Sequence, residues 1–247
     1  MSDEPEDEAL NRAAEKVAGW LTHLIDPDQL VEVRALEVLD GKKSRGKNGS
    51  TWAGTFHGTE LVEMAKAALS LSGKCFGVYY TLNPLKPEFH VVKAPRLGRV
   101  GKGQTADDKD VLARRWLLID FDPIKAAGFE KESATNDEKD RTRHYAVKVQ
   151  DWLNDQGWPR PVFSDSGNGH HLLYRFEDTP PVLPLPQDDP VRMALRMLAE
   201  SNLVPPGMID TTNFNPARIV KFPGTMACKG TPTDERPHRR ARVLETP

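Results

Sequence analysis

Apolar residues in the first part of the chain recur first at helical spacing and then at strand spacing. Over residues 9–25 they return every three or four positions, which predicts an amphipathic helix that ends before Asp26 and the proline after it. Residues 31–39 predict a strand and residues 59–71 a second helix. Between these two elements the Gly- and Lys-rich segment 41–50 predicts a loop.

The rest of the chain alternates between strands, hairpins and helices. The pattern predicts strands at 76–82 and 116–122, a loop at 98–110, a helix at 136–156, a hairpin from 162–164 and 171–176, a helix at 190–202 and a strand at 219–222. Ser133 or Thr135 can cap the first of these helices, and Asp189 followed by Pro190 can cap the second. Because hairpins interrupt the alternation of strands and helices, the pattern favours an α+β fold over a doubly wound sheet.

Composition narrows the class of protein. The chain has 247 residues, of which 38% are hydrophobic and 28% charged, as is typical of soluble globular proteins. No window approaches the run of about 18 apolar residues that a membrane helix requires. The acidic N-terminus lacks the apolar core of a signal peptide, so we expect a cytoplasmic protein without a membrane partner. Cys75 and Cys228 are far apart and form no C-x-x-C pair, which argues against a zinc site and a disulfide framework.

The charges are distributed unevenly. The net charge is −2, but five acidic residues lie within the first ten, and we expect residues 1–8 to be a disordered tail preceding a core at 9–247. Basic residues form three local clusters, namely Lys42, Lys43, Arg45 and Lys47; Arg114 and Arg115; and Arg236, Arg239, Arg240 and Arg242. Each cluster is compatible either with phosphate binding or with an ordinary solvated loop.

Two carboxylates share one face of the strand predicted at 116–122. Side chains alternate along a strand, so Leu117, Ile119 and Phe121 face a core while Asp120 and Asp122 point to the other side. Two carboxylates placed in this way repel each other unless a cation lies between them. Mg²⁺ or Mn²⁺, which prefer oxygen ligands, would supply that cation. The pair is equally consistent with a strand edge that carries two acids before a turn.

A Ser-Gly-Asn-Gly turn at residues 166–169 precedes the second strand of the predicted hairpin. Its bare backbone can approach a ligand closely. Alternation along the strand places Leu172 and Tyr174 on the apolar face and His171 on the open face, where a histidine can donate to a phosphate oxygen. His170 then has a structural role. The alternative is a plain hairpin turn, for which Asn-Gly is a strong signal.

A third acidic residue, Asp210, ends a short apolar stretch and is followed by Arg218 and Lys221 across an Asn-Pro turn. An arginine suits a fork of phosphate oxygens, and a lysine adds a point charge. The alternative is that Asp210 caps the local turn and that both cations are exposed to solvent.

Taken together, these segments resemble the three motifs of the archaeo-eukaryotic primase superfamily, and more closely those of primase-polymerases from phages, plasmids and other mobile elements. The matching residues are Asp120-Phe-Asp122, then Ser166-Gly-Asn-Gly-His-His171, then Ile209-Asp210 with Asn215-Pro-Ala-Arg218. They occur in the order that the family shows. The similarity extends on either side of the motifs, from Val31 to His238.

The resemblance implies a fold and a site. The fold would be a primase catalytic core in which an RNA-recognition-motif-like sheet at about 111–240 packs against an N-terminal α/β part at about 9–110. The resemblance implies three metal ligands for two Mg²⁺ or Mn²⁺ ions, namely Asp120, Asp122 and Asp210. It also implies a nucleotide-binding set that consists of Ser166, Gly167, Asn168, His171, Arg218 and Lys221.

The implied activity is DNA priming or DNA extension from nucleoside triphosphates, with ribose or deoxyribose, on a single-stranded DNA template. Stacking aromatics would line the template groove, and Trp52, Phe56 and Tyr80 are candidates, with core packing as their alternative role. Some relatives carry a cysteine-rich zinc stem, for which this chain has no cysteines. Many relatives continue into a helicase, so a helicase domain or protein is an expected partner, and the chain is either a fragment or a stand-alone core.

Two other functions compete with this one. A non-catalytic module that binds single-stranded DNA or an origin would have no use for converging carboxylates, which repel phosphate. A rolling-circle initiator nuclease needs two histidines on one face, separated by one residue, and a nucleophilic tyrosine. Because His170 and His171 are adjacent, they point in opposite directions, which disfavours the nuclease.

Overall fold

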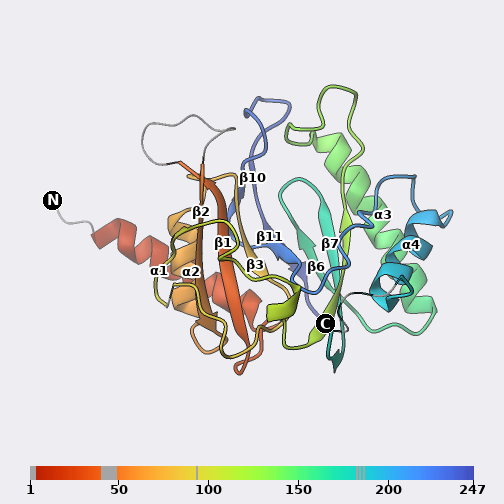
Figure 1. The fold of residues 1–247 in the computed structure, drawn as a ribbon. Coiled ribbons are helices and arrows are strands. Elements are labelled where there is room, and N and C mark those ends of the chain that lie inside the picture. Colours follow the sequence, from red (N-terminus) through yellow and green to blue (C-terminus); the bar gives the residue numbers. More distant parts are fainter. Residues whose placement is uncertain (1–3, 40–48, 93, 182, 184, 186) are drawn as a thin grey trace.

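Two antiparallel sheets face each other, and helices cover the outer side of each sheet (Figure 1). The computed structural model describes residues 4–247 except 40–48, 93, 182, 184 and 186. Every strand pairing among the described residues is antiparallel, which confirms the α+β class. No described helix is both long enough and apolar enough to cross a membrane.

The first sheet has five strands, in the spatial order β4 (Gly98–Val100), β2 (Ser50–His57), β1 (Leu30–Val38), β3 (Gly77–Thr81) and β8 (Ile219–Lys221). Helices α1 (Glu4–Leu21) and α2 (Leu61–Ser70) cover its outer face. Val17 and Met64 of the helices belong to the same buried cluster as Val31 and Phe56 of the sheet. Since β8 comes from the C-terminal half of the chain, this sheet is not built from residues 9–110 alone.

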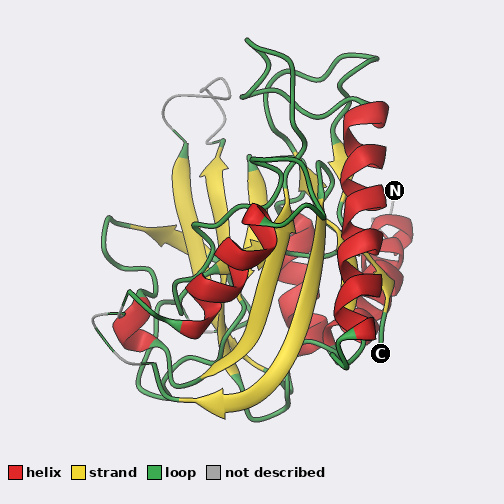
Figure 2. Ribbon diagram, turned by 90° about the vertical axis from the view of Figure 1, so that its right-hand side faces the viewer, coloured by secondary structure: helices red, strands yellow, loops and turns green. Residues whose placement is uncertain are grey.

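The second sheet has four strands, in the order β11 (Arg242–Glu245), β6 (Val162–Asp165), β7 (His170–Thr179) and β5 (Arg114–Phe121). Figure 2 shows the two helices that cover its outer face, α3 (Asn136–Asp155) and α4 (Pro190–Glu200). Ile119 and Phe121 of β5 pack there with Val149 and Leu153 of α3. A short 3₁₀ helix (Asp108–Asp110) and a small β9–β10 ladder (Met226–Ala227 with Arg239–Arg240) complete the fold.

The helix caps follow the sequence pattern. Thr135 caps α3, and its hydroxyl accepts from the backbone N–H of Glu138 while the Glu138 carboxylate accepts from the N–H of Thr135. Of the two candidates for this position, Thr135 is therefore the cap. Asp189 caps α4, with Pro190 at the first helical position, as expected. Together these caps fix where both outer helices begin.

Several segments differ from the sequence-based expectations. Residues 4–8, expected to belong to a disordered tail, are the first residues of α1, because acidic side chains are favourable at a helix N-terminus and Glu8 pairs with Arg12. The expected loop at 98–110 contains β4 and the 3₁₀ helix. Strand β2 was not predicted, and neither were β9, β10 and β11, whose two to four residues are too few to show a period.

In the two basic clusters that the structure describes, most arginines are engaged within the fold. Arg114 is buried and paired with Asp189, and Arg115 is buried and paired with Asp26 and Asp178. In the C-terminal cluster Arg236 is buried and forms a bidentate ion pair with Glu138. Arg239 and Arg240 donate hydrogen bonds to backbone carbonyls. Arg236, Arg239 and Arg240 therefore help to hold the fold together, whereas the side chain of Arg242 is 61% exposed. The cluster at Lys42–Lys47 lies outside the described residues.

Candidate active site

Three carboxylates meet at the end of β5, on the face of the second sheet that looks toward the first sheet. Asp120 and Asp122 project to this face, and the chain around Asp210 runs antiparallel beside them. The backbone N–H of Asp210 donates to the carbonyl of Asp120 (3.0 Å), and the N–H of Asp122 donates to the carbonyl of Met208 (2.8 Å). One carboxylate oxygen from each of the three aspartates lies within 4.8 Å of the others.

The electrostatics of this cluster favour a bound cation. The charge of Asp120, followed by partial desolvation, raises the pKa of Asp122 to about 6, and Asp210 adds to the rise. The side-chain amide of Asn213 donates to Asp120 (3.1 Å), and Thr212 donates to Asp210 through both its N–H and its hydroxyl (2.8 and 2.7 Å). The carboxylates are therefore held close together despite their repulsion. A ligand set made only of oxygens fits Mg²⁺ or Mn²⁺.

His171 lies beside the carboxylates, in the central strand β7. It is opposite Asp120 in one neighbouring strand and Ser164 in the other, and its Nε2 lies 3.3 Å from Oδ1 of Asp120. His170 points to the other face, where its Nδ1 lies 2.7 Å from the hydroxyl of Thr142. Burial lowers the pKa of His170 to about 4, so its ring is neutral. The side-chain alternation inferred from the sequence is thus the one observed.

The turn between β6 and β7 presents two side chains to the site. The hydroxyl of Ser166 accepts a hydrogen bond from the N–H of Gly169 (3.0 Å), and the side-chain oxygen of Asn168 accepts one from the N–H of Ala134 (3.0 Å). The Ser166 hydroxyl proton and the Asn168 amide hydrogens remain available to a ligand. A Cβ at position 169 would lie 2.2 Å from the carbonyl of Phe121, so only glycine allows the turn to approach β5 this closely.

Gly167 differs from the other residues expected to bind the nucleotide, because it does not line the cavity. Its φ of +94° is a conformation that favours glycine. A Cβ there would lie 2.7 Å from the side chain of Ala227. Gly167 is therefore required for the shape of the turn and its packing.

Two cations, one in β8 and one directly before it, face the carboxylates. Lys221 is buried in β8, donates to the carbonyl of Met226 (2.8 Å) and lies 5.0 Å from the ring centre of Tyr79. Burial lowers the pKa of Lys221 to about 8. Arg218 donates to the carbonyl of Thr212 (2.8 Å), while its buried Nε has no hydrogen-bond partner among the described residues. An unsatisfied donor of this kind suits an incoming anion.

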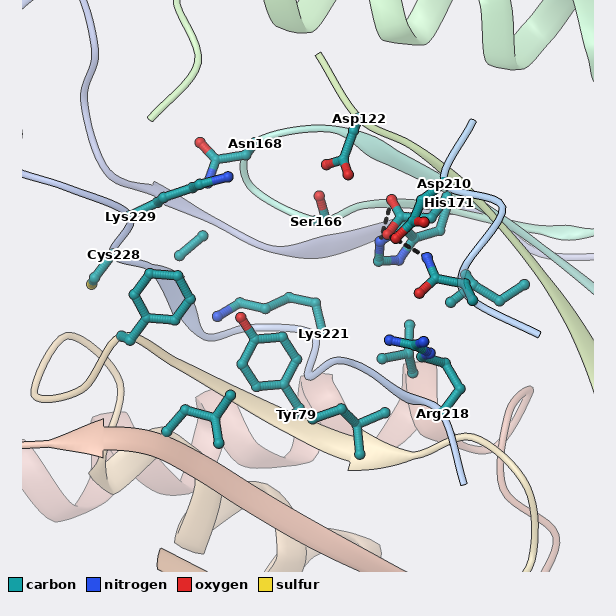
Figure 3. A pocket seen from close by; sticks show the side chains of 18 residues that line it. Tyr79, Asp122, Ser166, Asn168, His171, Asp210, Arg218, Lys221, Cys228 and Lys229 are labelled. Atoms are coloured by element: carbon teal, nitrogen blue, oxygen red, sulfur yellow. Dashed lines mark hydrogen bonds and ion pairs between the residues drawn. The ribbon is translucent and has the colours of Figure 1, made fainter. Parts of the chain in front are cut away.

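These side chains line one cavity of about 330 Å³ between the two sheets (Figure 3). It brings together all but one of the residues expected from the sequence, namely Asp120, Asp122, Asp210, Ser166, Asn168, His171, Arg218 and Lys221. The exception is Gly167. The sequence reasoning missed other residues that line the same cavity, namely Phe76, Tyr79, Asn213, Cys228 and Lys229.

Some of these missed residues could have been predicted from the sequence, and others could not. Asn213 follows Asp210 by three positions within the same motif and could have been found. For Tyr79 and Tyr80, alternation predicts opposite faces but does not say which of the two faces the core; the structure buries Tyr80, and Tyr79 lines the cavity. Tyr80 and Phe56, considered as template-stacking residues, are core residues, and Trp52 packs half-buried against the same core. Lys229 stands alone in a loop and gave no signal.

No protein-family model matches the chain, and no curated protein sequence matches it. The fold, an α+β pair of facing sheets with an acidic cavity between them, is primase-like. Its structure is similar to the crystal structure of primase RepB′, with a TM-score of 0.53 and 9% sequence identity. The alignment covers 95% of this chain and 56% of that one, so the chain spans little more than half the length of RepB′.

Proposed function

We propose that the protein is a DNA primase-polymerase of the archaeo-eukaryotic primase superfamily, which joins nucleotides on a single-stranded DNA template with a divalent metal. The observation that carries this proposal is the convergence of Asp120, Asp122 and Asp210 opposite two cations, Arg218 and Lys221, in one cavity. Carboxylates bind a metal, and the cations bind the phosphates that the metal also contacts. The likeness of the fold to primase RepB′ supports the same function.

The carboxylates would hold Mg²⁺ or Mn²⁺ through their oxygens. Such ions, when bound, make a 3′-hydroxyl more acidic and stabilise the charge that develops as pyrophosphate leaves. Asn213 and Thr212 keep the carboxylates of Asp120 and Asp210 oriented for this purpose. No described side chain is needed as a dedicated base, since the metal can serve.

The other side chains of the cavity would bind the incoming nucleoside triphosphate. His171 lies against Asp120 and is placed to donate to a phosphate oxygen near the metal. Arg218 and Lys221 offer positive charge from the opposite sheet, and Ser166 and Asn168 offer neutral donors from the turn. With donors on both sheets, the triphosphate would lie between them, and its α-phosphate would be next to the carboxylates.

The two competing functions fit the site less well. A module that only binds DNA would gain nothing from three carboxylates that repel phosphate. A rolling-circle nuclease needs both histidines on one face, and His170 and His171 point to opposite faces. It also needs a nucleophilic tyrosine, and burial raises the pKa of Tyr79, the tyrosine that lines the cavity, which disfavours its reactive phenolate.

A primer-extension assay tests the proposal. The protein is incubated with single-stranded DNA, with and without an annealed primer, labelled nucleotides and either Mg²⁺ or Mn²⁺. We expect products longer than the primer, or new primers, that depend on the metal and on the template sequence. If neither ribonucleotides nor deoxyribonucleotides are incorporated with either metal while the protein still binds single-stranded DNA, the binding module is the better description.

A further inference from the structure

Two partly exposed lysines, Lys125 and Lys229, lie beside the carboxylates. Lys229 lines the cavity, and its side chain approaches that of Lys125, which follows β5. Within the part of the chain that the structure describes, neither lysine forms an ion pair with a carboxylate, whereas Arg114, Arg115 and Arg236 all do. Two adjacent ammonium groups repel each other unless an anion lies beside them.

The backbone holds both lysines in this position. Lys125 donates to the carbonyl of Glu132, and the hydroxyl of Ser133 donates to the carbonyl of Lys229. Burial, followed by the charge of Lys229, lowers the pKa of Lys125 to about 8, which is the direction expected for crowded cations. Asp122 lies near both lysines and offsets part of their mutual repulsion, and a phosphate beside them would offset more of it.

The position of Lys229 within the cavity indicates which anion this is. Figure 3 shows Lys229 and Asn168 at one end of the cavity, Asp210 and Arg218 at the other, and Ser166 and Lys221 between them. The side-chain oxygen of Asn168 accepts a hydrogen bond from the N–H of Ala134. The side chain of Asn168 can therefore offer a ligand its amide N–H donors. An ammonium beside an amide donor, at the end away from Asp210, matches the last phosphate of a chain that begins at the carboxylates.

We propose that Lys229 binds the terminal phosphate of the incoming nucleotide and thereby selects triphosphates over diphosphates and monophosphates. This inference rests on the proposed function, because it takes the α-phosphate to lie at the carboxylates. Lys125 strengthens the local positive charge, and Asn168 shares the phosphate with Lys229. The phosphate of a template strand has the same chemistry, so the test separates these two sources.

The experiment measures competition against a labelled nucleoside triphosphate by fluorescence anisotropy in the presence of Mn²⁺. The competitors are the unlabelled tri-, di- and monophosphates of one nucleoside, and a labelled single-stranded oligonucleotide is titrated separately. The matched control is Lys131→Gln, which removes the same charge from an exposed lysine on the same loop as Lys125. Circular dichroism checks that each variant is folded.

For Lys229→Gln we expect the affinity for the triphosphate to fall about tenfold, the scale of one charge-assisted hydrogen bond. The affinities for the monophosphate and the oligonucleotide should stay within twofold of the wild type. Lys229→Arg, which keeps the charge, should retain most of the preference for the triphosphate. Lys131→Gln should behave as the wild type in every titration.

Three results would overturn the inference. An equal loss for tri-, di- and monophosphate would show that Lys229 only offsets the charge of Asp122. A loss of oligonucleotide affinity with unchanged triphosphate affinity would place Lys229 against the template. No change in either would leave it without a phosphate ligand. Failure of the proposed function is distinguishable from all three, since the wild-type protein itself would then show no metal-dependent nucleotide binding.

Discussion

Two groups of charged side chains, one at each end of β5, differ in whether their carboxylates are paired with cations. At one end of β5, Arg115 and Arg175 share hydrogen bonds with Asp26 and Asp178, two cations for two carboxylates. At the other end of the same strand, Asp120, Asp122 and Asp210 converge, and among the described residues no lysine or arginine forms an ion pair with them, although Nε2 of His171 lies 3.3 Å from Asp120. The first group is balanced internally, and the second is not.

The pKa shifts of the two groups run in opposite directions. Hydrogen bonding to Arg175 lowers the pKa of Asp26, and hydrogen bonding to Arg115 lowers that of Asp178. In the cavity the charge of Asp120 raises the pKa of Asp122. Charges that satisfy each other stabilise a fold, whereas charges of one sign held together need a ligand. On this ground we propose the unbalanced group as the functional one.

The largest expected effect comes from removing the unbalanced carboxylates. Asp120→Asn combined with Asp122→Asn should reduce nucleotide incorporation about a thousandfold or more, because the metal site is lost. The thermal midpoint measured without metal should stay the same or rise, since the repulsion is removed. Steady-state extension assays and thermal unfolding measure the two quantities. A variant that extends primers at nearly the wild-type rate would show that the active-site assignment is wrong.

The two histidines provide a sharper test at adjacent positions. His171→Ala should lower activity about tenfold to a hundredfold through the loss of one charge-assisted hydrogen bond, with little effect on the free energy of unfolding. His170→Ala should lower the free energy of unfolding by about 1–2 kcal/mol through the lost contact with Thr142. Extension kinetics and urea denaturation on both variants decide between them. The reverse pattern would place His170 in the site.

Breaking the balanced group should affect stability alone. Arg115→Met leaves Asp178 without its bidentate partner and removes one of the two arginines that bind Asp26, which should cost about 2 kcal/mol of unfolding free energy for a partly buried network. Measured well below the denaturation midpoint, activity per folded molecule should be unchanged. Urea denaturation and extension kinetics test this. Lost activity with normal stability would mean that this group also contributes to function.

The smallest effect concerns Lys221, whose pKa burial lowers to about 8. Between pH 8 and the ordinary lysine value near 10.5, the unfolded chain keeps a proton that the folded protein has released. The contribution of Lys221 to the free energy of unfolding therefore rises with pH. Triphosphate affinity should fall over the same range, by at most about tenfold per pH unit, as the ammonium charge is lost.

Titrations of the triphosphate from pH 7 to pH 9.5 on the wild type and on Lys221→Arg measure this effect. The arginine variant keeps its charge, so its affinity should change less with pH. Parallel pH profiles in the two proteins would remove Lys221 from the triphosphate site.

The helices and most of the longer strands were predictable because they have a clear period. In β5, alternation alone separated Ile119 and Phe121 in the core from Asp120 and Asp122 in the cavity. The cap at Thr135 followed from local hydrogen-bonding chemistry. Strand β2 was missed although it has eight residues, and strands β9 to β11 were missed because they are too short to show a period.

The candidate site was predictable only where chemistry is concentrated in a motif. The three aspartates, His171, Arg218 and Lys221 stand in such motifs, and one cavity contains all of them. Lys229 could not be found, because a single lysine in a loop shows no pattern in the sequence. Its role depends on the residues that the fold brings close to it. The same limit explains why Arg236 looked like part of a basic patch, since its partner Glu138 lies 98 positions away in the sequence.

Binding of Mn²⁺ tests most directly the claim that the unbalanced carboxylates form a metal site. The titration follows the free-ion signal by electron paramagnetic resonance, with the wild type, the Asp120→Asn/Asp122→Asn variant and Arg115→Met compared under the same conditions. We expect the wild type and Arg115→Met to bind Mn²⁺ with equal affinity and the double variant to lose that binding. Equal binding by all three proteins, or no binding by the wild type even with a nucleoside triphosphate present, would contradict the account.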